Sequence, residues 1–245
     1  MHSWRIYKED KMTNETKWTV LITGANKGLG YETARQLIER GYNVIIGARD
    51  EQRGREAADT LGAEFVQLDV TDDESVKQAA EHIKQTAGHI DILINNAGMS
   101  TRTADVVIAE AKKLYDTNVI GIMRVTESML PLLQESDNPV VVNVSSALGS
   151  FWAVTNPERR QFNFPTIVYG SSKAAVSMLT VQYAKTYPGI KFNAVEPGFT
   201  ATDLTPMSSA GQPVTDGAKV IVRMATIDKN GPTSTFQEGD ATLEW

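Results

Sequence analysis

Short apolar segments alternate with longer amphipathic segments along most of the chain. The apolar segments are rich in β-branched residues and predict six strands, at Thr19–Thr23, Asn43–Gly47, Glu64–Leu68, Asp91–Asn95, Val140–Val144 and Lys191–Val195. Between them, a helical period predicts helices near residues 29–40, 51–61, 73–87, 104–130, 168–186 and 216–226. Strands that are apolar almost throughout are typical of a parallel sheet covered on both faces. The pattern therefore predicts an α/β fold, with a doubly wound parallel sheet and right-handed crossovers.

No internal repeat, low-complexity stretch or linker divides this pattern, so we expect one domain over residues 18–245. The first 17 residues carry mixed charges and lack the apolar core of a secretion signal. We expect them to form a flexible extension, and the chain to start at either Met1 or Met12.

The composition argues against several classes of protein. Hydrophobic residues make up 41% of the chain and charged residues 22%, as in ordinary globular proteins. The formal net charge is −6 and no long basic run occurs, which argues against nucleic-acid binding. There is no cysteine, hence no disulfide or thiolate, and no apolar run approaches the roughly 20 residues of a membrane span. We therefore expect a cytoplasmic protein without a membrane segment, and the scattered His2, His82 and His89 give no reason to expect a metal site.

A glycine-rich turn, TGANKGLG at 23–30, lies between the first predicted strand and the first predicted helix. Glycines at 24, 28 and 30 would let the backbone turn sharply and approach a pyrophosphate at the positive helix N-terminus. The spacing is GxxxGxG rather than GxGxxG, so a plain tight turn is the alternative. With a strand before it and a helix after it, the turn predicts dinucleotide binding.

The end of the second predicted strand, Gly47-Ala48-Arg49-Asp50, bears on which dinucleotide binds. An NAD site places a carboxylate here for the adenosine ribose, whereas an NADP site places an arginine nearby. Ala48 stands where the acid is expected, Arg49 follows it, and Lys27 adds a second cation for a 2′-phosphate. These residues predict NADP(H), although solvated cations are the alternative and Asp50 would weaken the preference if it faced the ribose.

Tyr169 and Lys173 are four residues apart in the helix predicted at 168–186, hence on one face. A tyrosine hydroxyl titrates near pH 10, and a nearby ammonium favours the phenolate. Such a pair can donate a proton to a carbonyl or withdraw one from an alcohol. A surface Tyr–Lys pair without chemistry is the alternative.

Seven motifs occur together in a fixed order: TGANKGLG at 23–30, LDV at 68–70, NNAG at 95–98, Asn118, VNVSS at 142–146, YGSSK at 169–173 and PG at 197–198. On these motifs the chain resembles the short-chain dehydrogenase/reductase family, particularly its carbonyl-reductase-like members. The resemblance implies a Rossmann-type sheet of order 3-2-1-4-5-6-7, with a short seventh strand near Thr233–Phe236.

The resemblance also implies a catalytic set. Tyr169 would be the general acid in reduction, and Lys173 would lower the pKa of Tyr169 and hydrogen-bond the nicotinamide ribose. Ser146 would hold the substrate oxygen as charge develops on it, with Ser145 as the competing assignment. Asn118 would hold a water in a proton relay to Lys173, and its alternative is a polar position on a helix surface.

The cofactor site implied by the family is larger, and two of its members, Tyr169 and Lys173, are also catalytic. The remaining positions are Gly24, Asn26, Lys27, Gly28, Leu29, Gly30, Arg49, Asp69, Val70, Asn96, Ala97, Gly98, Pro197, Gly198, Thr200 and Thr202. Among them, Asp69 would accept a hydrogen bond from the adenine amino group. Thr200 and Thr202 would reach the nicotinamide carboxamide or the phosphates.

One segment departs from the family pattern. Ser146 and Tyr169 are 23 residues apart (169 − 146), farther than the family commonly places them. The excess is Ser150–Pro165, which carries four aromatic residues and has no clean period. It is either a wall or lid of the substrate pocket that favours apolar or aromatic carbonyls, or a surface loop with a few buried anchors.

These observations predict an NADPH-dependent reductase of aldehyde and ketone carbonyls, working in reverse as an NADP⁺-dependent alcohol dehydrogenase. The alternatives are a non-catalytic NADP(H)-sensing protein, or an epimerase or lyase on the same scaffold. The expected partner is a small carbonyl or alcohol. The family also includes dimers and tetramers that associate through the long helix, as well as monomers. Substrate, stereochemistry and direction in cells do not follow from the sequence.

Overall fold

The apolar segments predicted as strands form the centre of one mixed sheet. The computed structural model describes residues 18–100, 106–202 and 210–245, so the extension expected at 1–17 lies outside the described residues. The strands of that part of the chain are β1 (Thr19–Thr23), β2 (Asn43–Ala48), β3 (Glu64–Gln67), β4 (Ile92–Asn95), β5 (Val140–Val144), β6 (Lys191–Glu196), β7 (Thr235–Glu238) and β8 (Ala241–Leu243). Their order is β3-β2-β1-β4-β5-β6-β7-β8, which confirms the predicted order through β7.

Parallel pairing of the first seven strands places their carboxyl ends along one edge of the sheet, called the carboxyl edge below. β8 pairs antiparallel with β7 and was not predicted. It is three residues long and buries one of them, Leu243, so it has no alternating pattern to detect.

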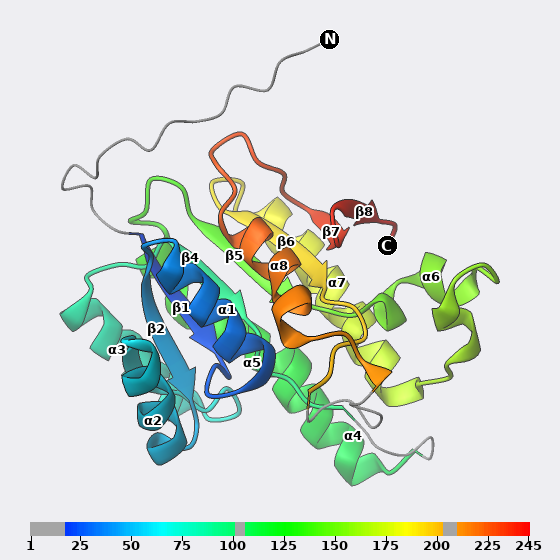
Figure 1. The fold of residues 1–245 in the computed structure, drawn as a ribbon, viewed down its shortest axis with the longest axis horizontal. Helices are drawn as coiled ribbons and strands as arrows, with labels where there is room; N and C mark the ends of the chain where they lie inside the picture. The colour runs from blue at the N-terminus through cyan, green and yellow to red at the C-terminus, as the bar shows by residue number, and fades with distance from the viewer. Residues whose placement is uncertain (1–17, 101–105, 203–209) are drawn as a thin grey trace.

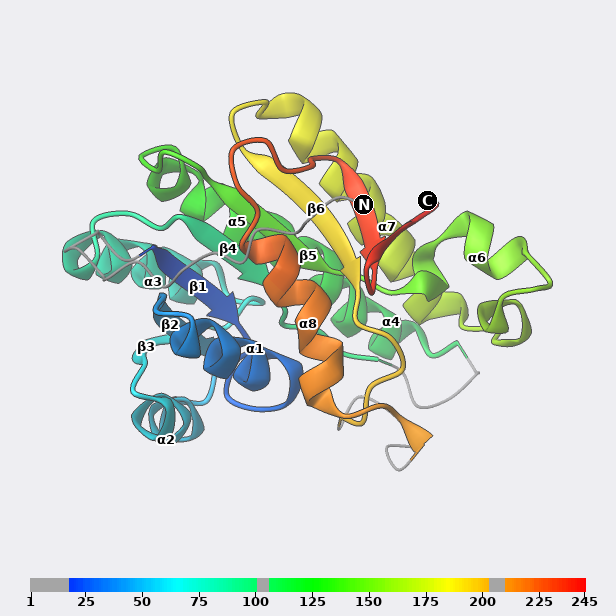
Figure 2. The ribbon, with the colours of Figure 1, turned by 45° about the horizontal axis from the view of Figure 1, so that its top comes forward.

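Helices cover both faces of the sheet (Figures 1 and 2). They are α1 (Gly28–Glu39), α2 (Glu51–Leu61), α3 (Asp73–Thr86), α4 (Ile108–Tyr115), α5 (Gly121–Leu133), α6 (Phe151–Thr155), α7 (Ile167–Thr186) and α8 (Val214–Ala225), with short 3₁₀ turns η2 (Ala147–Gly149) and η3 (Arg160–Asn163). Helices α1, α2 and α8 enclose one core with the sheet, and α3, α5 and α7 enclose the other.

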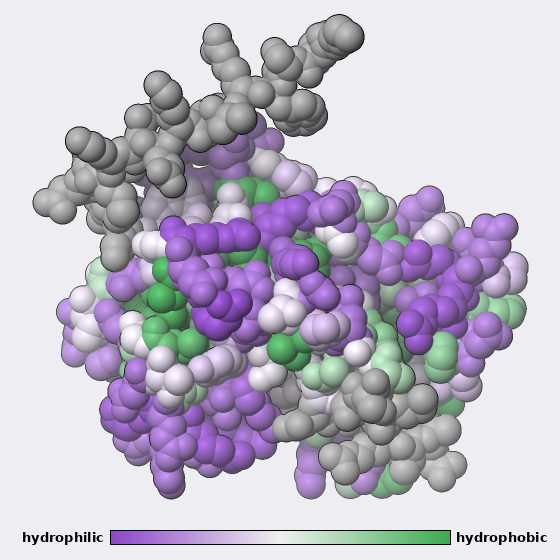
Figure 3. All heavy atoms as spheres, in the orientation of Figure 1, coloured by the Kyte–Doolittle hydropathy of each residue, from purple (hydrophilic) through white to green (hydrophobic). Residues whose placement is uncertain are grey.

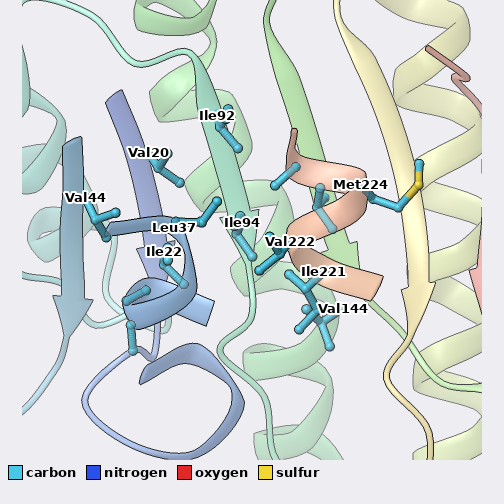
Figure 4. Packing of buried hydrophobic residues seen from close by; sticks show 14 of the residues in the cluster. Val20, Ile22, Leu37, Val44, Ile92, Ile94, Val144, Ile221, Val222 and Met224 are labelled. Carbon is cyan, nitrogen blue, oxygen red and sulfur yellow. The ribbon is translucent and has the colours of Figure 1, made fainter. Parts of the chain in front are cut away.

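Alternation along each strand fills both cores. On β1, Val20 and Ile22 face the core under α1 and α8, whereas Leu21 faces the core under α3 and α5. Figure 4 shows the first of these cores, where Leu37 and Ile221 meet the strand residues. Burial on both faces accounts for strands that are apolar almost throughout.

The helix predicted at 104–130 begins and ends later than predicted and is less regular than its pattern indicates. It runs from Ile108 to Leu133 as α4, a π-helical segment η1 (Asp116–Ile120) and α5. Residues 104 and 105 lie outside the described residues. A π segment adds a residue to one turn, which the apolar period of 3.6 does not reveal.

The segment Ser150–Pro165 is ordered as α6 and η3, and it is attached to the C-terminal strands. The hydroxyl of Ser150 donates to the carbonyl of Glu244 at 2.7 Å, and the amide of Trp152 donates to the carbonyl of Trp245 at 3.2 Å. Phe162 and Phe164 remain exposed. In Figure 3, hydrophobic residues reach the surface around α6, whereas the surface over α2 and α3 is mostly hydrophilic.

Candidate active site and dinucleotide site

Two glycines of the turn after β1 are required by close packing. Gly24 has φ +64°, and a Cβ at this position would lie 2.9 Å from the Cα of Ala97. A Cβ at Gly30 would lie 2.5 Å from Nδ2 of Asn96 and 2.8 Å from the carbonyl oxygen of Gly24. The predicted turn therefore packs its backbone against the turn after β4, where a side chain would not fit.

Asn96 joins these two turns at the carboxyl edge. Its Nδ2 donates to the carbonyls of Thr23, at 2.8 Å, and Gly24, at 3.1 Å. In return, the hydroxyl of Thr23 accepts from the amides of Asn96 and Ala97, both at 3.0 Å. The sequence assigns Asn96 and Ala97 to the cofactor site, and the structure places them directly beside the glycine turn.

The N-terminus of α1 differs from those of α2 and α3. Helices α2 and α3 have Asp50 and Asp72 as their N-caps, and the carboxylates of these residues accept hydrogen bonds from backbone amides of the first turn. At α1 the N-cap is Lys27, with no side-chain cap and no acidic residue in the first turn. The positive end of the α1 dipole therefore meets no carboxylate from its own helix, an arrangement that suits a phosphate.

Cationic side chains lie near the N-terminus of α1. Arg49 is exposed directly after β2, and a hollow of about 270 Å³ between α1 and α2 is lined in part by Asn26, Lys27 and Arg53. Arg53 was missed by the sequence analysis. The sequence feature that could have identified it is an arginine one helical turn after Arg49, on the side of α2 that faces the glycine turn.

Asp50, the residue that would weaken an NADP preference, is bound to other groups. It accepts from the amide of Arg53 at 3.0 Å and from its guanidinium at 2.9 and 2.8 Å. These hydrogen bonds from Arg53 lower the pKa of Asp50, so the carboxylate stays charged and engaged with α2.

The loop after β3 holds two predicted cofactor residues. One carboxylate oxygen of Asp69 accepts from the amide and hydroxyl of Thr71, at 2.9 and 2.8 Å. Val70 is buried and packs against Gly121 at the start of α5. These contacts fix the loop. The hydrogen bond from adenine to Asp69 and the place of Val70 in the cofactor site stay predictions.

Lys173 is the centre of the candidate catalytic group. It is 6% exposed, and its ammonium donates to the carbonyl of Val144, at the end of β5, at 2.8 Å. Its Nζ lies 5.7 Å from the ring centroid of Tyr169. Burial lowers the pKa of Lys173 to about 8, partly offset by the charge of Glu196.

The pKa of Tyr169 is raised in the structure, whereas Lys173 was expected to lower it. Burial raises the pKa of Tyr169 above its usual value, and the nearby charge of Glu196 raises it further, while a hydrogen bond from Ser146 lowers it. The ammonium stands against the ring and is bound to Val144, so desolvation dominates at the phenol. The protein alone therefore favours the neutral phenol.

The two serines after β5 are distinguished by their surroundings. Ser145 is 3% exposed, and its hydroxyl contacts the carbonyl of Lys173 at 3.2 Å and the hydroxyl of Ser177 at 3.4 Å. Ser146 caps η2, accepts from the amide of Leu148 at 3.3 Å, and interacts with Tyr169. The geometry favours Ser146 over Ser145 as the residue facing the substrate.

Asn118 lies in the π segment η1 and is fully buried, so it is not a polar residue of the helix surface. Its side chain accepts from the amide of Met99 at 2.8 Å and donates to the carbonyl of Met99 at 2.9 Å. A Cβ at Gly98 would lie 3.4 Å from Oδ1 of Asn118 and 3.8 Å from Nζ of Lys173. Asn118, Gly98 and Lys173 thus converge, and π segments often occur at functional sites.

The loop after β6 carries the last predicted cofactor residues. Gly198 has φ +79°, and Thr202 lies near the glycine turn, 3.7 Å from a Cβ built at Gly28. Thr200 is buried, and its hydroxyl donates to the carbonyls of Pro197 and Gly198 at 3.2 and 3.0 Å. These hydrogen bonds hold the loop together, and a contact of Thr200 with the nicotinamide carboxamide or the phosphates stays a prediction.

Glu196, the last residue of β6, is a functional candidate that the sequence analysis missed. It is 7% exposed and accepts from the amides of Ala147 and Gly198, the latter at 2.9 Å. Burial raises the pKa of Glu196, and the nearby hydroxyl of Ser146 acts in the opposite direction. The available signal was an acidic residue directly after the predicted strand Lys191–Val195.

The part of the chain that the structure describes also bears on metal binding and on membrane crossing. It contains no group of three or more His, Cys, Asp or Glu side chains placed to hold a metal ion. None of its helices is both long and apolar enough to cross a membrane.

Known proteins resemble this chain over most of its length. The family model for short chain dehydrogenase matches residues 18–213. (+)-Neomenthol dehydrogenase from Arabidopsis thaliana is 33% identical over 278 residues, covering 88% of this chain and 94% of that protein. (-)-Isopiperitenone reductase from Mentha piperita is 33% identical over 310 residues, covering 94% and 98% respectively.

A solved structure agrees with these relatives. Salutaridine reductase from Papaver somniferum has a TM-score of 0.78 to this chain at 28% identity, covering 92% of this chain and 100% of that one. The resemblance inferred from the motifs is confirmed, and the chain belongs to the short-chain dehydrogenase family.

Proposed function

We propose that the protein is an NADPH-dependent reductase of aldehyde and ketone carbonyls, reversible as an alcohol dehydrogenase. The observation that carries this proposal is the convergence of Asn118 and Lys173 on Gly98 at the carboxyl edge, with the ring centroid of Tyr169 5.7 Å from the ammonium of Lys173. Open α/β sheets bind ligands beyond this edge. Relatives named as a dehydrogenase and a reductase support the same class of reaction.

The residues at the edge fit the parts of a nicotinamide dinucleotide. The uncapped start of α1 and the amides of Gly28 and Leu29 would hold the pyrophosphate. Gly98, where an added Cβ would have Asn118 Oδ1 at 3.4 Å, would let its backbone approach the ribose, and Pro197 and Gly198 would wall the nicotinamide ring. When bound, the reduced cofactor supplies a hydride to the carbonyl carbon.

Tyr169 then supplies the proton. Its raised pKa keeps the phenol protonated at neutral pH, which is the state that a general acid needs. The phenol donates its proton to the carbonyl oxygen, and Ser146 donates a hydrogen bond to the same oxygen as negative charge develops. Lys173, largely protonated below its pKa of about 8, stabilises the phenolate that remains.

The preference for NADPH rests on the cations near β2. Arg49 follows β2 and is exposed; its charge acts on the neighbouring Asp50, but the hydrogen bonds of that carboxylate come from Arg53. Lys27 and Arg53 line the same hollow. A 2′-phosphate carries close to two negative charges, and a guanidinium binds it through two parallel hydrogen bonds.

The test follows absorbance at 340 nm while purified protein consumes NADPH with a panel of aldehydes and ketones, beside NADH. We expect turnover with NADPH for at least one carbonyl and a much lower kcat/KM with NADH. Equal use of NADH would refute the cofactor assignment. Binding of NADPH without turnover of any carbonyl would favour a sensing protein, and product formation without net NADPH loss would favour an epimerase or lyase.

A further inference from the structure

Arg124, on α5, connects three elements beside the predicted cofactor site. Its side chain is 16% exposed, and its guanidinium donates to the carbonyl of Val70, in the loop after β3, at 2.6 Å. The guanidinium also donates to the carboxylate of Asp73 at the start of α3, and its Nη2 lies 3.4 Å from a carboxylate oxygen of Asp116 in η1. The donors of a guanidinium form a fixed planar fork, so this one side chain sets the loop, α3 and the π segment relative to one another.

The loop after β3 also lies directly against the start of α5. Gly121 precedes Arg124 by three residues, so the two residues are neighbours on the helix surface. A Cβ at Gly121 would lie 3.0 and 3.1 Å from side-chain carbons of Val70 and 3.1 Å from its carbonyl oxygen. Close packing at Gly121 and a charge-assisted hydrogen bond from Arg124 therefore hold the residue next to Asp69, the predicted acceptor for adenine.

The third branch of Arg124 reaches the segment that carries Asn118. Asp116 begins η1, two residues before Asn118. From the same segment, the side-chain amide of Asn118 donates to the hydroxyl of Ser172 on α7 at 3.2 Å. π turns are rare, so contacts of this kind to neighbouring elements decide where such a turn is placed. Arg124 holds the exposed side of the π segment, and Asn118 holds its buried side.

Resting on the cofactor site and the reductase function proposed above, we propose that Arg124 is a positioning residue for both halves of the dinucleotide. Through Val70 it fixes the loop where the adenine would bind. Through Asp116 it fixes the segment that places Asn118 beside Gly98, on the nicotinamide side. Loss of the guanidinium therefore weakens binding of the adenosine half and slows the reaction at the nicotinamide half.

An arginine that only stabilises the fold would behave differently, and Arg35 on α1 provides the matched control. Its guanidinium also binds two carboxylates, those of Glu32 and Glu39, at 2.7 and 2.5 Å. Both of these belong to its own helix, so Arg35 connects no loop of the carboxyl edge. Arg35→Gln removes a comparable set of ion pairs without releasing the loop after β3 or the π segment.

The first experiment measures binding of adenosine 2′,5′-bisphosphate, the adenosine half of NADPH, by calorimetry. We expect its Kd to rise about 10-fold in Arg124→Gln, the effect of losing one hydrogen bond from a charged donor. Arg124→Lys should lose less, because an ammonium keeps the charge but lacks the fork. Arg35→Gln should bind as wild type does. In Arg124→Gln the Kd values of NADPH and NADH should rise by the same factor, since both carry adenosine, whereas Arg49→Ala should weaken NADPH alone.

The second experiment separates the branch to the π segment from the branch to the loop. In Asp116→Asn, the single-turnover rate of carbonyl reduction with saturating NADPH should fall about 2–5-fold, because a partly exposed ion pair contributes little. The Kd for adenosine 2′,5′-bisphosphate should stay unchanged, since Val70 keeps its hydrogen bond. Asp216→Asn is the control, because Asp216 pairs with Lys219 on the exposed face of α8.

These outcomes decide the two parts of the proposal separately. An unchanged Kd for adenosine 2′,5′-bisphosphate in Arg124→Gln, or an equal loss in Arg35→Gln, would overturn the role at the loop. An unchanged single-turnover rate in Asp116→Asn would overturn the link to Asn118. If Arg124→Gln does not fold, Arg124→Lys provides the same binding test. Failure of wild type to bind the nucleotide would instead refute the proposed cofactor site, and binding without reduction of any carbonyl would refute the reductase function while the test at the loop still holds.

Discussion

The turn after β1 and the turn after β5 lie along the same carboxyl edge but present different chemical groups. The turn after β1 presents backbone amides and is flanked by exposed or half-buried cations, with glycines at positions that no side chain fits. The turn after β5 is surrounded by ionisable side chains whose pKa values depart from their usual range, the half-buried Tyr169 and the buried Lys173 and Glu196. One region is suited to holding a fixed charge, and the other to moving a proton.

The difference predicts that binding and catalysis can be lost separately. Variants near β1 and β2 should weaken the cofactor with little effect on proton transfer. Variants near β5 and α7 should abolish proton transfer while the cofactor still binds.

The largest effect is expected for Tyr169→Phe. Loss of the general acid should lower kcat by about 10²–10⁴-fold, because positioned proton donors contribute that much. Binding of NADPH, followed by its fluorescence, should change little. Tyr183→Phe is the matched control: Tyr183 is on the same helix but donates to Glu127 on α5, so its loss should leave kcat unaltered. Loss of NADPH binding in Tyr169→Phe would contradict the separation of the two regions.

Arg49→Ala should produce the reverse pattern. We expect its Kd for NADPH to rise about 10–100-fold, because hydrogen bonds to charged groups contribute about 1.5–3 kcal/mol. The Kd for NADH should stay nearly constant, since NADH lacks the 2′-phosphate. Titration of both cofactors into Arg49→Ala and Lys77→Ala, an exposed cation of α3, would measure this. An equal loss for both cofactors would show that Arg49 does not face the phosphate.

Gly24→Ala tests the close packing of the glycine turn. We expect a loss of about 1–3 kcal/mol in the free energy of unfolding and weaker NADPH binding, because positive φ and a clash with Ala97 act together. Gly62→Ala is the control, since Gly62 has φ +67° with nothing within 4 Å of its added Cβ. Urea unfolding of both variants separates the clash from the backbone strain. Equal losses would mean that the approach to Ala97 does not matter.

The smallest effect is expected from the aromatic segment before α7. The guanidinium of Arg160 lies 5.8 Å from the ring of Phe164 and 5.2 Å from that of Phe199, in the loop after β6. If this segment is a wall of the substrate pocket, Phe164→Ala should lower kcat/KM for aromatic ketones by up to about tenfold and spare small aldehydes. Phe151→Ala, at the exposed start of α6, should change neither. If wild type, Phe164→Ala and Phe151→Ala have identical substrate profiles, the segment is a surface element and not a wall of the pocket.

Local sequence patterns predicted most of the fold and most of the residues around the glycine turn. Strands apolar on both faces and glycines at 24 and 30 are consequences of local packing, so the alternation and the motif reveal them. Arg53 was missed because its role depends on which face of α2 turns toward α1. Strand β8 was missed because three residues carry no period.

The catalytic side depends on contacts between distant parts of the chain. Sequence motifs place Tyr169 and Lys173 together, but the direction of the pKa shift of Tyr169 comes from burial and from Glu196, 27 residues away (196 − 169). The same holds for the π segment at Asn118, which an apolar period does not reveal. Charges and irregular turns of this kind follow only from the assembled sheet.

The most direct measurement is a crystal structure of the protein with NADP⁺ bound. We predict that C4 of the nicotinamide faces the hydroxyl of Tyr169 and that the ammonium of Lys173 contacts the ribose. The 2′-phosphate should lie against Arg49. A phenol turned away from the ring, or a ring excluded from the space between Gly98 and Gly198, would contradict it.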